Sequence, residues 1–204
     1  MAVSKTKAKL VDVARQLFAK MGVENTTMND IALASKKGRR TLYTYFKSKE
    51  DIYMAVVESE LDMLSDMMKR VAEKNISPDE KMIEMIYTRL DAVKEVVFRN
   101  GTLRANFFRD IWRVEKVRKR FDAKEILLFK DVLREGVEKG VFRIDDIDMT
   151  AELVHYCVKG IEVPYIRGHI GAKLDDETRD KYVVNLVFGA LHRTCLLYTS
   201  PSPR

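Results

Sequence analysis

The sequence predicts an all-α fold of about nine helices. Along most of the 204 residues, apolar side chains recur with the period of an amphipathic helix, and no segment alternates as a half-buried strand does. Capping residues and glycines stand where such helices would begin and end. Hydrophobic residues make up 46% of the chain, and there are only nine Gly and four Pro, which excludes a disordered or collagen-like protein.

The chain begins with a predicted amphipathic helix over about residues 6–21. Its apolar side chains form one stripe, and Gly22 supplies the stop. A second, short helix is expected over about residues 28–35. The hydroxyls of Thr26 and Thr27 are suitable N-caps for it.

A third short helix and a long fourth one follow closely. Residues 36–38 predict a tight turn, and residues 39–46 the third helix. Ser48 is a suitable cap for a helix that reaches about residue 74. Three short helices within 50 residues, followed by a long one, form a distinctive layout.

The rest of the chain continues the helical pattern. Ser77, Pro78 and Glu80 form a start signal with a capping box and a proline at the first helical position. The helices expected beyond that point span about residues 78–99, 102–112, 114–139, 149–163 and 176–191. We expect a break near Phe121 and Asp122, and an end of the 149–163 helix before Pro164.

Positive charge is concentrated at the start of the chain. Residues 1–50 carry 11 basic and 4 acidic side chains, whereas residues 51–204 carry 26 and 27. This distribution is typical of a small head that binds a polyanion, attached to a nearly neutral body.

The head has the pattern of a helix-turn-helix motif, in which two short helices flank a tight turn. The second helix of such a motif lies in the major groove and presents its first residues to base edges. Arg39 and Arg40 occupy that place, and arginine matches the two acceptors of guanine. Thr27, at the start of the preceding helix, is a candidate phosphate contact. Lys36 and Lys37 add positive charge.

The run LFAKMGVENTTMNDIALAS, followed by RRTLYTYFKSKEDIYMAV, resembles the TetR family of transcriptional regulators over about residues 8–56. The resemblance implies a DNA-binding head, a long linking fourth helix, and a helical body that dimerises and holds a small ligand. It makes Thr27, Tyr43, Tyr45 and Lys49 phosphate-side contacts and residues 38–44 the groove-facing set. The expected DNA-binding residues are therefore Thr27, Lys36, Lys37, Gly38, Arg39, Arg40, Thr41, Tyr43, Thr44, Tyr45 and Lys49.

The turn departs from the family pattern. The family commonly has Gly and then Val where this chain has Lys36 and Lys37. A lysine in a left-handed conformation costs about 1 kcal/mol. We therefore expect Gly38 to take over part of the turn.

The resemblance divides the chain into a helix-turn-helix domain over residues 4–64, with the motif at about 27–46, and a ligand-binding and dimerisation domain over residues 65–194. Residues 195–204, which contain two prolines and no core-facing pattern, are expected to be a disordered tail or a cloning scar. The expected function is that of a dimeric transcriptional regulator, a repressor that a small molecule releases from a palindromic operator.

Two alternatives stay open. One is a DNA-binding protein of the same fold without an inducer, and the other is a helical small-molecule-binding protein or enzyme with an incidental basic head. The sequence has no Gly-rich phosphate loop, no HExxH and no GxSxG, so we expect no enzyme activity.

The body offers candidates for a ligand pocket but not for a metal site. Glu152 and His155 form half of an ExxH pair, and a second pair is absent, so neither a metal nor a cofactor is expected. Aromatic and histidine side chains are the candidate pocket residues: Tyr87, Phe107, Phe108, Trp112, His155, Tyr156 and Tyr165.

The two most apolar helical stretches lie near the end of the chain, at residues 153–163 and 183–191. Helices apolar over most of their circumference are buried on more than one side. The resemblance implies that the last two helices pair across a two-fold axis. Two isolated cysteines, no secretory signal and no stretch long enough to span a bilayer predict a cytoplasmic protein without membrane contact.

Overall fold

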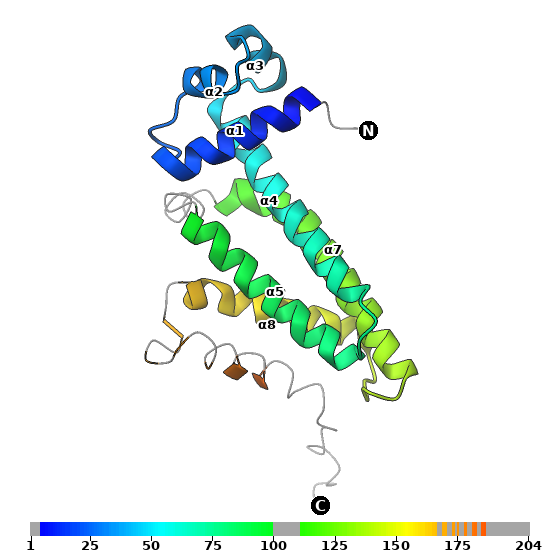
Figure 1. Ribbon diagram of the computed structural model, residues 1–204. Coiled ribbons are helices and arrows are strands. Elements are labelled where there is room, and N and C mark those ends of the chain that lie inside the picture. The colour runs from blue at the N-terminus through cyan, green and yellow to red at the C-terminus, as the bar shows by residue number, and fades with distance from the viewer. Residues whose placement is uncertain are drawn as a thin grey trace, which may run out of the picture. The chain divides into compact units, whose positions relative to one another are not determined.

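A computed structural model of the chain describes residues 5–99 and 111–166, together with 169–170, 173, 175, 178, 181–182 and 185–186. This part of the chain contains seven helices and no strand, as predicted for an all-α fold (Figure 1). Residues 178, 181–182 and 185–186 are helical, within the last helix expected from sequence. Most of the helix expected over residues 102–112, and the tail at 195–204, lie outside the described residues.

The chain divides into two compact units. The first comprises residues 1–66 and 92–123, and the second comprises residues 67–91 and 124–204. Three long helices contribute residues to both units: α4 (Lys49–Ala72), α5 (Pro78–Arg99) and α7 (Ile111–Glu138). The predicted helix boundaries of α4 and α5 agree with the observed ones to within two residues.

In the first unit, α1 (Lys5–Met21) packs against α2 (Met28–Ala34), which in turn packs against α3 (Arg39–Tyr45) (Figure 1). Their apolar faces share a core with the start of α4. Its fully buried side chains are Leu10, Ala14, Phe18, Ile31, Leu42 and Ile52. These side chains form a hydrophobic core within the first unit. Burial of each large apolar side chain in it stabilises the folded state by about 1.5–3 kcal/mol.

An ion pair fastens α1 to α4 within the first unit. The Nε of Arg15 lies 2.8 Å from a carboxylate oxygen of Glu60, which is buried. One terminal nitrogen of Arg15 also donates to the hydroxyl of Ser59, at 2.8 Å. Because a guanidinium presents its donors in a fixed fork, these contacts fix the orientation of α1 on α4.

The second unit contains parts of α4, α5 and α7 and all of α8 (Ile147–Ile166). Its buried apolar residues include Met82, Met85, Ile86, Phe129, Leu133 and Val158. None of the described helices is long and apolar enough to cross a membrane.

Two expectations about helix continuity are wrong. Helix α7 runs without a break through Phe121 and Asp122, because neither residue breaks a helix and both side chains are buried. Helix α8 continues past Pro164 to Ile166. Pro164 cannot donate a hydrogen bond to the carbonyl of Gly160, four residues earlier, and the helix ends two residues after it.

Candidate nucleic-acid interface

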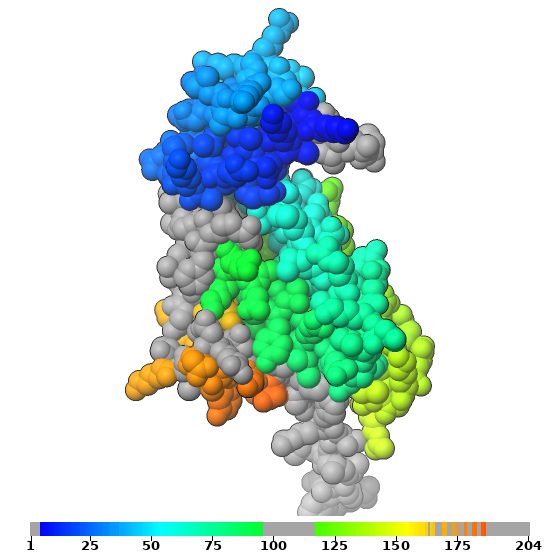
Figure 2. Space-filling model, viewed as in Figure 1, coloured from blue at the N-terminus to red at the C-terminus, as the bar shows by residue number. Residues whose placement is uncertain are grey.

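The segment from the end of α2 to the start of α4 is basic and open to solvent. Residues 31–49 carry four lysines, two arginines and no acidic side chain. Arg39, Arg40 and Lys36 are exposed. In Figure 2 the lighter blue atoms of the α2–α3 segment lie uncovered on the side away from the dark blue α1. A surface of this kind attracts the phosphate backbone of a nucleic acid.

Thr27 caps α2 in the predicted way, and the cap occupies its donors. The Thr27 hydroxyl donates to the carboxylate of Asp30 at 2.7 Å and accepts from the Asp30 N–H at 3.2 Å. The Thr27 N–H also donates to that carboxylate, at 2.8 Å. The hydroxyl bond, and next the backbone bond, hold the pKa of Asp30 below its usual value. A phosphate contact by Thr27 therefore requires Asp30 to release these donors, and it stays a prediction.

The turn between α2 and α3 is a Schellman motif with lysine at the position that glycine usually takes. The N–H of Lys36 donates to the Leu33 carbonyl at 3.0 Å, and that of Lys37 donates to the Ala32 carbonyl at 3.1 Å. Lys36 has a φ of 55°, in the left-handed region. Gly38 has a φ of −64° and is the N-cap of α3. The expectation that Gly38 takes over part of the turn is therefore wrong.

Replacing Lys36 by glycine should separate stability from binding. We expect Lys36→Gly to raise the free energy of unfolding by about 1 kcal/mol, because glycine adopts a left-handed conformation without strain. The same change removes one cation, so the slope of log affinity for DNA against log salt should become shallower by about one. Urea unfolding and DNA titrations at several salt concentrations measure the two effects. An unchanged or lower unfolding free energy would contradict the assignment of strain to Lys36.

Helix α3 has one buried and one exposed face. Leu42 and the C-cap residue Phe46 are buried in the first unit's core. The side chains of Arg39, Arg40, Tyr43, Thr44 and Tyr45 are exposed, and Thr41 is half-buried. The structure thus places most of the predicted groove-facing residues on the exposed face of one helix, whereas Leu42, which belongs to the predicted set 38–44, is buried.

Lys49 holds the start of α4 against the loop between α1 and α2. Its Nζ donates to the carbonyl oxygens of Val23, at 2.8 Å, and Glu24, at 3.2 Å. An ammonium group has three hydrogens, so one donor is left for the predicted phosphate contact. Sequence reasoning assigned the charge of Lys49 to DNA and missed its structural contacts.

The candidate pocket residues of the body differ in their exposure. His155 and Tyr165 are buried and Tyr87 is half-buried, whereas Tyr156 is 60% exposed. Phe107 and Phe108 lie outside the described residues. Trp112 belongs to α7, but its side chain is also outside them.

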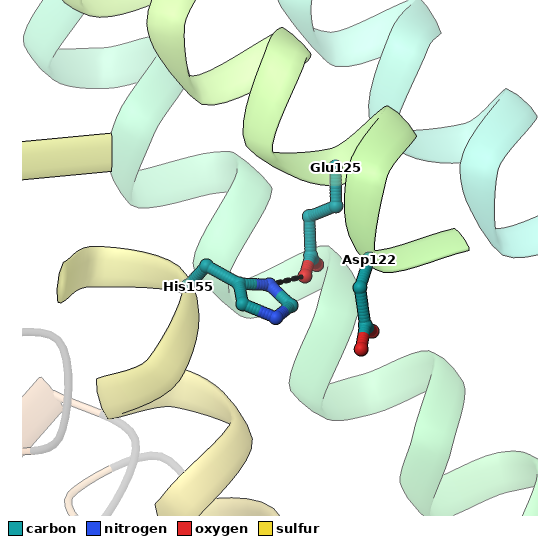
Figure 3. A group of neighbouring side chains, drawn as sticks. All are labelled: Asp122, Glu125 and His155. Carbon is teal, nitrogen blue, oxygen red and sulfur yellow. Dashed lines mark hydrogen bonds and ion pairs between the residues drawn. The ribbon is translucent and has the colours of Figure 1, made fainter. Parts of the chain in front are cut away.

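A buried ionic cluster occupies the interior of the second unit. Arg89 of α5 lies 3.0 Å from the carboxylate of Glu125 on α7 and 3.2 Å from that of Glu162 on α8. The other oxygen of Glu125 is 2.5 Å from Nδ1 of His155 on α8 (Figure 3). Asp122 precedes Glu125 by one turn of α7. One oxygen of Glu125 thus faces the Arg89 guanidinium, and the other faces the His155 imidazole.

Sequence analysis missed this cluster except for His155. Charged residues on amphipathic helices usually lie on the solvated face, and Arg89, Glu125 and Glu162 are more than 30 residues apart along the chain. The exposed Glu152, which the sequence paired with His155, takes no part in the cluster. No signal in a single sequence joins these three side chains.

Comparison with known proteins supports the helix-turn-helix head. The profile of bacterial regulatory proteins of the tetR family matches residues 10–56, which cover the helix-turn-helix segment. The HTH-type transcriptional repressor KstR2 of Mycolicibacterium smegmatis is 28% identical over 152 residues, which are 72% of each chain.

Two solved structures share the fold. A transcriptional regulator from Cytophaga hutchinsonii superposes with a TM-score of 0.73 at 20% identity, over 90% of this chain and 97% of that one. The regulator FadR from Bacillus subtilis, solved in complex with stearoyl-CoA, gives a TM-score of 0.64 at 15% identity, over 91% and 99%. The relatives found are transcriptional regulators rather than enzymes. With its helix-turn-helix head, its all-helical body and these relatives, the chain belongs to the TetR family of DNA-binding transcriptional regulators.

Proposed function

We propose that the protein is a dimeric repressor that binds a palindromic operator through α3 and leaves it when a small molecule binds the second unit. The observation that carries this proposal is the acid-free segment 31–49 with the exposed face of α3 at its centre. Two heads related by a two-fold axis would place their α3 helices about 34–36 Å apart, one turn of duplex.

An apolar stripe on α8 supports a dimer. Met149, Leu153, Tyr156 and Gly160 follow one another at spacings of four, three and four residues, which places them on one face of the helix. All four are exposed, and a Cβ added at Gly160 would meet no atom within 4 Å. A stripe of this kind on a regular helix fits a second helix, and we assign it to the same region of a second copy.

The small-molecule step is supported by the fold. FadR of Bacillus subtilis, which has the same fold, was solved with stearoyl-CoA. Helix α4 contributes residues to both units and is the candidate lever between ligand and DNA. A ligand shifts the equilibrium between two head spacings by no more than its differential affinity for the two states. A ligand that binds the second unit but leaves operator affinity unchanged would contradict this step.

The dimer and its role in DNA binding are tested together by one substitution. We expect Leu153→Glu to convert the dimer to a monomer, because it buries a charge at the centre of the stripe. The variant should then bind labelled duplex from the region upstream of the gene far more weakly, since only one half-site is held. Sedimentation velocity measures the dimer and fluorescence anisotropy measures the binding.

Leu127→Glu is the matched control. Leu127 lies on α7 in the same unit and is 59% exposed, against 57% for Leu153. The control should remain dimeric and bind DNA as the unmodified protein does. If Leu153→Glu is also dimeric and binds normally, the dimer does not form through α8.

A further inference from the structure

We propose that Arg40 and Thr44 act as one reading unit, which recognises a guanine and a nearby thymine in each operator half-site. Thr44 contributes through its methyl group rather than its hydroxyl. This inference rests on the proposed function, because it assigns a base preference to the same exposed face of α3. It concerns which sequence is bound, whereas the proposed function concerns whether a sequence is preferred at all.

The burial pattern of α3 selects these two residues. Leu42 is fully buried and Phe46 is 3% exposed, so together they mark the inner side of the helix. Arg40 precedes Leu42, and Thr44 precedes Phe46, by two residues, which is a rotation of about 200° around a helix. Arg40 and Thr44 are therefore at the centre of the outer face, and both are exposed. Arg39, three residues before Leu42, lies nearer the flank.

The hydroxyl of Thr44 is already used. It donates to the carbonyl oxygen of Arg40 at 2.9 Å, which engages its only hydrogen within the helix. Thr44 therefore has no hydroxyl hydrogen left to donate to a base, and its methyl group is its apolar contact surface. In the major groove its natural partner is the 5-methyl group of thymine, because apolar contact with that methyl distinguishes thymine from the other bases.

The spacing of the two side chains limits the sequence they read. Four residues advance a helix by about 6 Å along its axis. Stacked base pairs are about 3.4 Å apart. A guanine bound through its two acceptors by Arg40 therefore lies one or two base pairs from the thymine that Thr44 contacts.

The test begins with a duplex selected from a random library by the full-length protein. Each thymine of the selected half-site is then replaced by deoxyuridine, which removes the 5-methyl group and nothing else. We expect one position at which this change weakens binding of the unmodified protein by about fourfold per half-site, the effect of one buried methyl group.

Two variants of Thr44 separate the methyl from the hydroxyl. Thr44→Ser keeps the hydroxyl and loses the methyl, so it should bind about fourfold more weakly per half-site and ignore deoxyuridine at that position. Thr44→Val keeps a methyl and loses the hydroxyl, so it should bind within about twofold of the unmodified protein and keep the sensitivity to deoxyuridine. Because Thr44 is exposed, thermal unfolding of both variants should show intact folding.

The guanine is tested in the same way with 7-deazaguanine, which lacks the N7 acceptor. The unmodified protein and the control Arg39→Ala should lose about tenfold in affinity or more on this duplex, whereas Arg40→Ala should be insensitive to the change.

Any one of three outcomes would overturn the inference. One is a selected duplex with no thymine within two base pairs of the guanine. Another is equal sensitivity of Thr44→Ser and the unmodified protein to deoxyuridine at every position, and a third is a loss of binding in Thr44→Val as large as in Thr44→Ser. If selection yields no preferred duplex, the proposed function fails as well, which distinguishes that failure from a wrong assignment of bases.

Discussion

Replacing Arg89 by methionine is expected to lower the free energy of unfolding by about 3–5 kcal/mol. Arg89 is 1% exposed and lies between the buried carboxylates of Glu125 and Glu162. Without the guanidinium, both carboxylates lose the cation that lies against them, and removing one partner of a buried ion pair is among the most costly changes in a protein. The loss is a large share of the about 5–15 kcal/mol by which a domain is usually stable. Urea unfolding followed by circular dichroism measures it.

Two further variants show whether charge or packing is responsible. Arg134→Ala removes an exposed arginine of the same unit, which pairs with Asp131 on its own helix, and should cost no more than about 0.5 kcal/mol. A variant in which Arg89, Glu125, Glu162 and His155 are all replaced by apolar residues should regain most of the stability, because it removes the ion-pair partners together. If Arg89→Met costs no more than Arg134→Ala, the cluster does not stabilise the second unit.

The double substitution Arg39→Ala, Arg40→Ala is expected to weaken binding to the preferred duplex by at least about 1–3 kcal/mol, since an arginine that contacts a guanine contributes about that much. Binding to unrelated duplexes should fall much less, so the preference between sequences largely disappears. Competition titrations with preferred and scrambled duplexes measure the ratio.

The matched control for this double variant is Lys69→Ala, Arg70→Ala. Lys69 and Arg70 are exposed and belong to the second unit, and replacing both removes the same charge as the Arg39→Ala, Arg40→Ala variant does. The control should keep the preference between sequences. Equal loss of preference in both double variants would mean that net charge, and not base contact, determines binding.

Local signals explain why most of the fold could be predicted from the sequence. The helix starts depend on contacts between residues that are three positions apart in the sequence, as in the capping box of Thr27 and Asp30. At Ser77, the N–H and the hydroxyl donate to Glu80 at 3.0 Å and 2.8 Å. Gly22 and Gly140, with φ of 87° and 71°, end α1 and α7 as glycines with that conformation commonly do.

The remaining features depend on tertiary structure. Pro164 lies inside the last turn of α8, although proline usually ends a helix. Lys49 binds carbonyls that lie about 25 residues earlier in the chain, and Arg89 meets carboxylates from two other helices. Such contacts arise only after helices pack. The DNA-facing residues were accessible to sequence analysis because one short helix carries most of them.

The measurement that tests the central claim most directly is fluorescence anisotropy of labelled duplexes from the region upstream of the gene. It is made at about 50 mM and 200 mM salt, with the unmodified protein and with the Arg39→Ala, Arg40→Ala variant. We expect tight binding to one palindromic duplex, a fall in affinity of about a thousandfold between the two salt concentrations, as six or more phosphate contacts require, and loss of the preference in the variant. Weak binding that is equal on every duplex and insensitive to both salt and the substitutions would contradict the account.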